Sequence, residues 1–214
     1  MDELDQICEQ IRQDFERKNT RRDAALTQAR QLTRHASLAV RAIHREEVQE
    51  AQAELQSARE LVQALREGLK DDPDLYFTGY TQDAIKEYVE AQLTVALILN
   101  QPLPTPAELG AEYPAYLAGL AETLGELRRR CLDLLRPGYS NDVERLLSWM
   151  DDIFTQLVTM DFPDAITQGL RRRTDLARGI IERTRADITL SFRQSEMEAA
   201  INRLSDQLNH QTEG

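Results

Sequence analysis

The sequence predicts an all-α protein, and three observations carry that prediction. No glycine or proline occurs before Gly68, and the chain up to that point is rich in Ala, Leu, Gln, Glu and Arg, which are good helix formers. Strand-like alternation of β-branched residues does not interrupt this stretch. Later segments repeat apolar residues at helical spacing between breaks that contain proline or glycine. We therefore expect a single-domain bundle of six to seven helices with long N-terminal helices.

The first 70 residues predict an antiparallel pair of helices, because one helix of that length is improbable in a compact domain. The pair covers about 4–45 and 47–69, with a reversal placed near 43–47 from length alone. A third helix over about 75–100, bending at Gly79, follows a loop in which Asp72 or Asp74 is the expected cap.

A stiff connector with three alternating prolines separates these helices from the second half of the chain. Three more helices are expected there, each bounded by Pro, Gly or a capping residue: about 113–136, from Ser140 or Asn141 onward, and 165 to beyond 190. We expect residues 1–195 to form the helical domain and the polar residues 196–214 to form a partly frayed tail.

Composition narrows the class of protein. The 214 residues suffice for a sizeable core, and 41% of them are hydrophobic. No apolar run approaches the roughly 18–20 residues of a membrane span, and the acidic N-terminus does not resemble a secretory signal, so a cytoplasmic protein is expected. Cys8 and Cys131 make no disulfide framework, and Cys131 falls on an apolar helix face as an expected core residue.

The net charge of −11 argues against a nucleic-acid binder, but the distribution of charge matters more than its total. Basic residues of the first predicted helix fall within roughly 60° of one another at 3.6 residues per turn. Two interpretations are open: a solvated face with intrahelical ion pairs, or a track for phosphates. The residues of this arginine stripe are Arg12, Arg30, Arg34, Arg41 and Arg45, with His44 beside them.

Two pairs of acids stand at helical spacing. Glu87 and Glu90 are three residues apart, and Glu122 and Glu126 are four apart on a later helix. Carboxylate ligands suit Mg²⁺ or Mn²⁺, although such pairs are also common on ordinary solvated faces. Gly119 shares the face of the second pair and costs about 1 kcal/mol relative to Ala inside a helix. A glycine there admits either a neighbouring backbone or a bound ligand, which favours a site.

Other catalytic motifs are missing from the sequence. It contains no Gly-rich phosphate loop, nucleophile elbow, HExxH or Glu-x-x-His pattern. The histidines are His35, His44 and His210, too few for a zinc or iron site of the usual kind.

Two segments of the chain resemble the translin family, most closely its translin-associated factor X branch. The first is Lys86-Glu-Tyr-Val-Glu-Ala91. The second is Tyr116-Leu-Ala-Gly-Leu-Ala-Glu-Thr-Leu-Gly-Glu-Leu-Arg-Arg-Arg-Cys131, which is long and specific. The resemblance covers roughly residues 14–192.

The resemblance implies an all-α protein that assembles into hollow, roughly octameric shells around single-stranded nucleic acid. The factor X branch is a Mg²⁺-dependent endoribonuclease, and its acidic residues fall on Glu87, Glu90, Glu122 and Glu126. At Glu122 the branch commonly has Asp, so the carboxylate here is displaced by roughly 1.5 Å, the length of one C–C bond.

The leading hypothesis is a Mg²⁺- or Mn²⁺-dependent endoribonuclease for short single-stranded RNA, working inside a homo-oligomeric shell. The four glutamates would ligate the metal, and the strand would be held by Arg30, Arg34, Arg41, His44 and Arg45. The second hypothesis is a non-catalytic oligomer that binds single-stranded RNA or DNA, and the third is a helical scaffold for protein partners.

Overall fold

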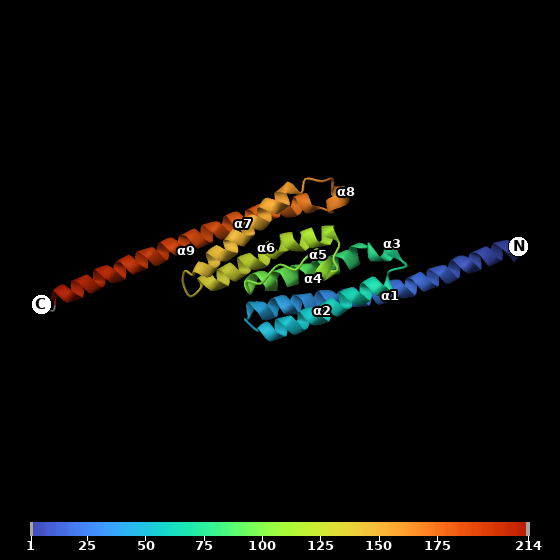
Figure 1. The fold of residues 1–214 in the computed structure, drawn as a ribbon, viewed down its shortest axis with the longest axis horizontal. Helices are drawn as coiled ribbons and strands as arrows, with labels where there is room; N and C mark the ends of the chain where they lie inside the picture. Colours follow the sequence, from blue (N-terminus) through green and yellow to red (C-terminus); the bar gives the residue numbers. More distant parts are fainter. Residues whose placement is uncertain (1, 213–214) are drawn as a thin grey trace. The chain divides into compact units, whose positions relative to one another are not determined.

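The computed structural model describes residues 2–212, which form nine α-helices and no strand (Figure 1). This confirms the all-α prediction. Three of the nine helices have only four residues, and the six longer ones correspond to the six predicted from the sequence. The helices are α1 (Asp2–His44), α2 (Val48–Gly68), α3 (Pro73–Tyr76), α4 (Gly79–Ile98), α5 (Pro106–Leu109), α6 (Tyr113–Leu135), α7 (Asn141–Thr159), α8 (Asp164–Thr167) and α9 (Leu170–Thr212).

The chain divides into two compact units, Met1–Leu120 and Ala121–Gly214, and the boundary falls inside α6. The expected division into a domain over 1–195 and a tail over 196–214 stays a prediction. Within the described residues, the helix α9 continues through that tail to Thr212.

In the first unit, α1 and α2 form the predicted antiparallel pair and lie side by side (Figure 1). The reversal lies within the predicted range, and Glu46 takes a positive φ of 65° there. Most of the buried residues of α1 are alanines, whose small side chains let neighbouring helices approach closely. The buried residues of α1 and the start of α2 are Ala25, Ala29, Leu32, Ala36, Ala39, Ala42, Ile43 and Ala51.

The helix α4 packs on this pair and is buried on most of its circumference. Ile85, Val89 and Leu93, which follow one another at four-residue spacing, are fully buried. The polar residue Thr94 is also 0% exposed. A helix that packs against several neighbours needs a wider buried surface than a single apolar stripe provides.

The predicted third helix is two helices, because the chain breaks at residues 77–78 before α4 begins at Gly79. Asp72 occupies the N-cap position of α3 but makes no side-chain cap hydrogen bond. Its carboxylate instead accepts a hydrogen bond from Arg21 of α1 and is 1% exposed. This ion pair, with a buried carboxylate and a partly exposed arginine, connects α1 to the start of α3.

The second unit contains the rest of α6 with α7, α8 and α9. Ser140 caps α7 as predicted, because its side-chain oxygen accepts a hydrogen bond from the Asp142 amide. Cys131 is fully buried, as the sequence predicts. Burial raises the pKa of the Cys131 thiol to about 12.

Both terminal helices extend beyond the helices that cover them within their own units (Figure 1). The first turns of α1 and the last turns of α9 expose large apolar side chains at three- and four-residue spacing. These terminal stripes consist of Leu4, Ile7, Ile11 and Phe15 on α1, and Leu190, Met197, Ile201, Leu204 and Leu208 on α9.

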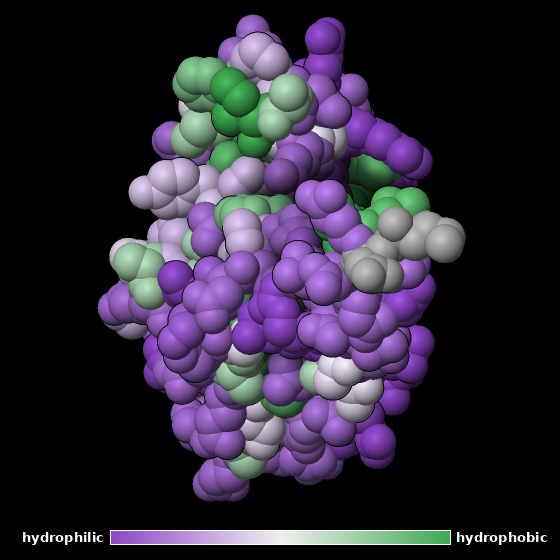
Figure 2. Space-filling model, turned by 90° about the vertical axis from the view of Figure 1, so that its right-hand side faces the viewer, coloured by the Kyte–Doolittle hydropathy of each residue, from purple (hydrophilic) through white to green (hydrophobic). Residues whose placement is uncertain are grey.

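The surface in Figure 2 is predominantly hydrophilic, with scattered apolar side chains. Across the described residues, no helix combines the length and the apolar character that crossing a membrane requires.

Candidate functional site

The site begins with a close contact between α4 and the start of α6, inside the first unit. A Cβ atom at Gly119 would lie 2.8 Å from Val89 Cγ1 and 2.9 Å from the Lys86 carbonyl oxygen. Real Cβ atoms do not approach other atoms so closely. Gly119 therefore admits the neighbouring helix, which is the first of the two roles expected for it.

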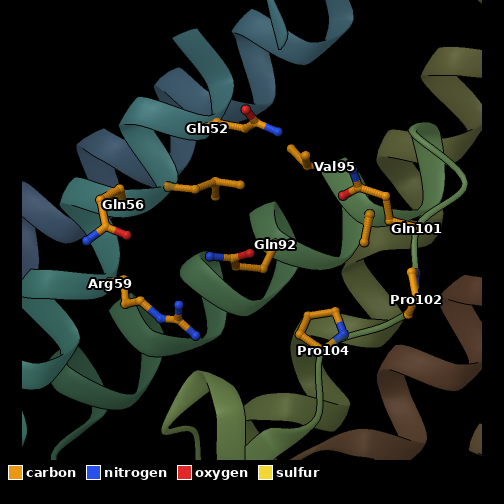
Figure 3. Close-up of a pocket in the computed structure, with 10 residues that line it drawn as sticks. Gln52, Gln56, Arg59, Gln92, Val95, Gln101, Pro102 and Pro104 are labelled. Atoms are coloured by element: carbon orange, nitrogen blue, oxygen red, sulfur yellow. The ribbon is translucent and has the colours of Figure 1, made fainter. Parts of the chain in front are cut away.

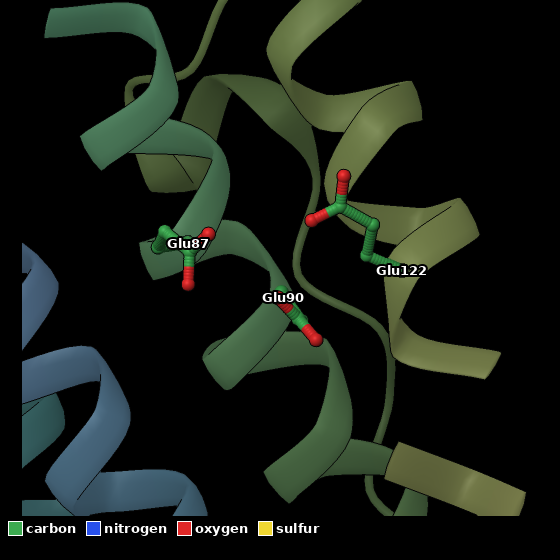
Figure 4. A group of neighbouring side chains, drawn as sticks. All are labelled: Glu87, Glu90 and Glu122. Carbon is green, nitrogen blue, oxygen red and sulfur yellow. The ribbon is translucent and has the colours of Figure 1, made fainter. Parts of the chain in front are cut away.

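Three of the predicted glutamates come together across this contact. Glu87 and Glu90 are one turn apart on α4, and Glu122 lies three residues beyond Gly119 on the continuous helix α6. One carboxylate oxygen from each lies within 4.8 Å of the other two. Figure 4 shows the three side chains on the two helices. We call these three residues the carboxylate trio.

The carboxylate trio is accompanied by cations. Lys86 Nζ lies 2.9 Å from Glu87 Oε1, and the lysine side chain is only 13% exposed. Arg173 of α9 donates from Nε to Glu122 Oε1 over 3.2 Å. These ion pairs reduce the mutual repulsion of three neighbouring carboxylates. A divalent cation would bring the same positive charge that Lys86 and Arg173 now supply.

The donor set fits a hard divalent ion. Mg²⁺ binds oxygen at 2.0–2.1 Å, so two of its ligands lie at most about 4.2 Å apart. Only one pair among three octahedral ligands can lie opposite each other, and adjacent ligands lie about 2.9 Å apart. The separations in the carboxylate trio lie within 4.8 Å, so side-chain rotations would need to close up to about 2 Å. Mg²⁺ also keeps several waters and needs few protein ligands. A cluster of three acidic residues in this structure could therefore bind a metal.

Glu126 lies one turn beyond Glu122 on α6 and is not part of the carboxylate trio. Its carboxylate lies 3.6 Å from Arg129 Nη1, and its side chain is 25% exposed. Its assignment as a fourth ligand stays a prediction.

The arginine stripe lies on α1, and its members differ in their partners. Arg45 is bound to Glu47, with Nη2 2.6 Å from the carboxylate, and Arg12 is bound to Glu9. Arg30, Arg34 and Arg41 are exposed and form no ion pair with any residue in the described part of the chain. His44 is half-buried. Arg12 and Glu9 form the intrahelical ion pair that the solvated-face interpretation expects. The phosphate track stays a prediction.

A separate pocket of about 300 Å³ lies between α2, α4 and the proline-rich connector (Figure 3). Its polar lining is four glutamine amides and one arginine, with no carboxylate, so it is not a second candidate for a metal. The pocket is lined by Gln52, Leu55, Gln56, Arg59, Gln92, Val95, Ala96, Gln101, Pro102 and Pro104.

Sequence reasoning did not identify the two cations beside the trio. Lys86 is the first residue of the first motif, and its position next to Glu87 was visible in the sequence. Arg173 belongs to the run Arg171-Arg172-Arg173, but it meets Glu122 across 51 residues of chain. No local pattern could have indicated that pairing.

No protein-family model matches the chain. An uncharacterized protein of Methanocaldococcus jannaschii is 28% identical over 206 residues, which are 95% of this chain and 89% of that protein.

Solved structures give a closer likeness. AfC3PO in complex with duplex RNA superposes with a TM-score of 0.80 at 33% identity, covering 86% of this chain and 95% of that one. A crystal structure of AfC3PO gives 0.80 at 32% with the same coverage. Apo-NeC3PO, at 0.78 and 19% identity over 86% of this chain and 96% of that one, shares the fold. With this identity over nearly the whole of AfC3PO, the chain belongs to the translin family of C3PO-type proteins.

Proposed function

We propose that this protein is a metal-dependent endoribonuclease of the factor X type, which cleaves short single-stranded RNA inside a homo-oligomeric shell. The metal is Mg²⁺ or Mn²⁺, and its ligands are Glu87, Glu90 and Glu122, with Glu126 as the fourth residue of the site.

The observation that carries the proposal is the approach of three carboxylates to within 4.8 Å in a protein of the translin family. Two of them come from one motif and the third from another, 32 residues later in the chain. The glutamate at position 122, where the factor X branch has aspartate, still reaches the other two carboxylates. The longer side chain is therefore compatible with a shared ion.

When bound, the metal would activate a water molecule and stabilise negative charge on the phosphate. The chain's own residues do the rest. Glu87, Glu90 and Glu122 hold the ion and orient the attacking water by accepting its hydrogen bonds. Lys86 and Arg173, which lie beside the glutamates, would neutralise the phosphate that is cleaved.

The unpaired arginines of α1 support RNA binding. Arg30, Arg34 and Arg41 lie at helical spacing on one face, and each is free to contact a phosphate without first breaking an ion pair. Arg45 and His44 complete the proposed track. Arginine contacts to phosphates carry little sequence preference, so the strand would be held without a base code. AfC3PO has been solved with duplex RNA, which makes duplex RNA a necessary comparison.

The terminal stripes support assembly. Five apolar side chains of α9 and four of α1 are between 48% and 69% exposed. Apolar surface of this extent on projecting helices is typical of an interface between subunits. A homo-oligomeric shell, an octamer by resemblance to the family, would cover it.

The test is incubation of the purified protein with labelled RNA, single-stranded or duplex, in Mg²⁺, Mn²⁺ or EDTA, beside the Glu90→Gln variant. The proposal expects metal-dependent cleavage of single-stranded RNA that is lost in the variant. A matched control is Glu67→Gln, which changes an exposed glutamate bound to Lys70 and should leave cleavage intact. Equal cleavage by wild type and Glu90→Gln would remove the assignment.

A second function, a non-catalytic RNA- or DNA-binding oligomer, is favoured by one observation. Glu87 and Glu122 already have cationic partners, so the carboxylate trio has a purely structural explanation as an ion-pair cluster. This alternative expects salt-sensitive binding of oligonucleotides with no turnover in any metal.

A further inference from the structure

A second pocket, of about 390 Å³, lies between α1 and α4 and has Glu87 of the carboxylate trio in its wall. Its residues occur at helical spacing, with Leu26, Ala29, Arg30 and Thr33 on α1 and Tyr80, Asp83, Ala84 and Glu87 on α4. Both helices belong to the first unit and pack against each other. A pocket of this volume suits a ligand about the size of one nucleoside.

Polar groups in this pocket have unfilled hydrogen-bonding capacity. The Tyr80 hydroxyl oxygen is buried and has no hydrogen-bond partner within the described chain. Asp83 and Arg30 also make no hydrogen bond or ion pair with any residue described. Exposed Asp83 and Arg30 can be satisfied by water, but a buried hydroxyl left unpaired costs free energy. A polar ligand that forms a hydrogen bond with the Tyr80 hydroxyl would therefore be stabilised in this pocket.

The chemistry of these groups fits a ribose better than a base. A carboxylate accepts a hydrogen bond from a sugar hydroxyl, and a phenol can donate to that same hydroxyl oxygen. The apolar wall of Leu26, Ala29 and Ala84 suits the carbon face of a sugar or a base. Arg30 at the edge can contact the adjoining phosphate.

We infer that this pocket binds the nucleoside next to the scissile phosphate, and that Tyr80 and Asp83 recognise its ribose 2′-hydroxyl. The inference rests on the proposed function, because Glu87 places the pocket beside the metal site. The 2′-hydroxyl is both donor and acceptor, and it is the group that distinguishes RNA from DNA. Tyr80 and Asp83 are thus specificity-determining residues that select RNA over DNA.

The Asp83 carboxylate both favours RNA and disfavours DNA. Asp83 repels a phosphate strand, and with RNA this cost is offset by the hydrogen bond from the 2′-hydroxyl. A deoxyribose offers no such donor, so the carboxylate and the Tyr80 hydroxyl stay unpaired and DNA is penalised. A site with arginines alone would bind RNA and DNA with similar affinity.

The experiment measures binding of one single-stranded sequence, made as RNA and as DNA, by fluorescence anisotropy in EDTA. Wild type, Tyr80→Phe and Asp83→Asn are compared, with Tyr113→Phe and Asp71→Asn as matched changes at exposed positions of the same unit. We expect wild type to prefer RNA, and each pocket variant to lower the RNA-to-DNA affinity ratio by about tenfold, the effect of one lost hydrogen bond. The two controls should keep the wild-type ratio.

Two results would overturn the inference: equal binding of RNA and DNA by wild type, or an unchanged ratio in both pocket variants. Asp83 is exposed, so Asp83→Asn keeps the test available if Tyr80→Phe does not fold.

The two proposals fail separately. Binding in EDTA requires no catalysis, so a protein that selects RNA through Tyr80 and Asp83 but never cleaves it contradicts only the nuclease assignment. A protein that cleaves RNA and DNA alike in Mg²⁺ contradicts only the role given to this pocket.

Discussion

The carboxylate trio and the arginine stripe are two charged regions of the molecule that differ in how their charges are compensated. In the trio, Lys86 and Arg173 are already bound to Glu87 and Glu122. In the stripe, Arg30, Arg34 and Arg41 have no ionic partner among the residues described.

This difference indicates separate tasks. A compensated cluster keeps its geometry before any ligand arrives, as a preorganised site must. Arginines without an ionic partner on an exposed helix face lose little solvation energy when they contact a phosphate. They can therefore attract and bind a negatively charged strand. Mutations in the trio should therefore change the cleavage rate, and mutations in the stripe should change the affinity for the RNA strand.

The largest effect is expected when the two trio residues of α4 are neutralised together. Glu87→Gln with Glu90→Gln should lower the cleavage rate by at least about a thousandfold, because two hard ligands are lost. RNA affinity should be unchanged or slightly higher, since two negative charges are removed. Cleavage kinetics and anisotropy on the same RNA measure both. A large loss of RNA affinity in this variant would contradict the separation of tasks between the carboxylate trio and the arginine stripe.

Neutralising the unpaired arginines should weaken RNA binding and leave the cleavage rate unchanged. The Arg30→Gln, Arg34→Gln, Arg41→Gln triple variant should weaken RNA binding by tenfold or more, and the slope of log K against log salt should fall in magnitude by about 2. The rate at saturating RNA should persist. Arg12→Gln, which removes a stripe arginine bound to Glu9, is the control and should change the slope little.

A substitution at Gly119 tests the contact that brings the trio together. Gly119→Ala places a methyl group within 3 Å of Val89 and the Lys86 carbonyl, so it should destabilise the fold by about 1–3 kcal/mol. For a chain of this size, that lowers Tm by several degrees in a thermal melt. Gly125→Ala is the matched control, because no atom lies within 4 Å of its Cβ position. It should be neutral or stabilising, since alanine favours the helix.

The smallest effect concerns Cys131, which lies outside both regions and reports whether variants remain folded. Burial raises its pKa to about 12, so at pH 8 the folded protein keeps this thiol protonated and unreactive. Iodoacetamide should label only the exposed Cys8 before denaturation and both cysteines afterwards, as counted by mass spectrometry. In the unfolded chain the thiol ionises near pH 8.5, so the folded state binds more protons above that pH, and its stability should fall as pH rises toward 12.

Much of the fold could be predicted because helix signals are local. Ser140 identified the start of α7, and chain length located the reversal between α1 and α2. The reversal itself uses Glu46 at a positive φ, a conformation that no glycine or asparagine indicated. The four-residue helices were not all predicted, since single turns have too little periodicity to detect.

The candidate site was only partly predictable. Helical spacing identified both glutamate pairs and the resemblance supported them, but spacing could not indicate which of the four carboxylates converge. That depends on how closely α6 approaches α4, which Gly119 allows. The pocket at Tyr80 joins residues of two helices about 50 positions apart in the chain, and no pattern along either helix indicates it.

The terminal stripes have a thermodynamic consequence. If neighbouring copies cover these apolar side chains, part of the free energy that keeps the chain folded comes from association and follows mass action. The thermal midpoint should then rise with protein concentration, and dilution alone should loosen the projecting turns of α1 and α9. Both the assembly that encloses the site and the stability of the fold would then increase with protein concentration.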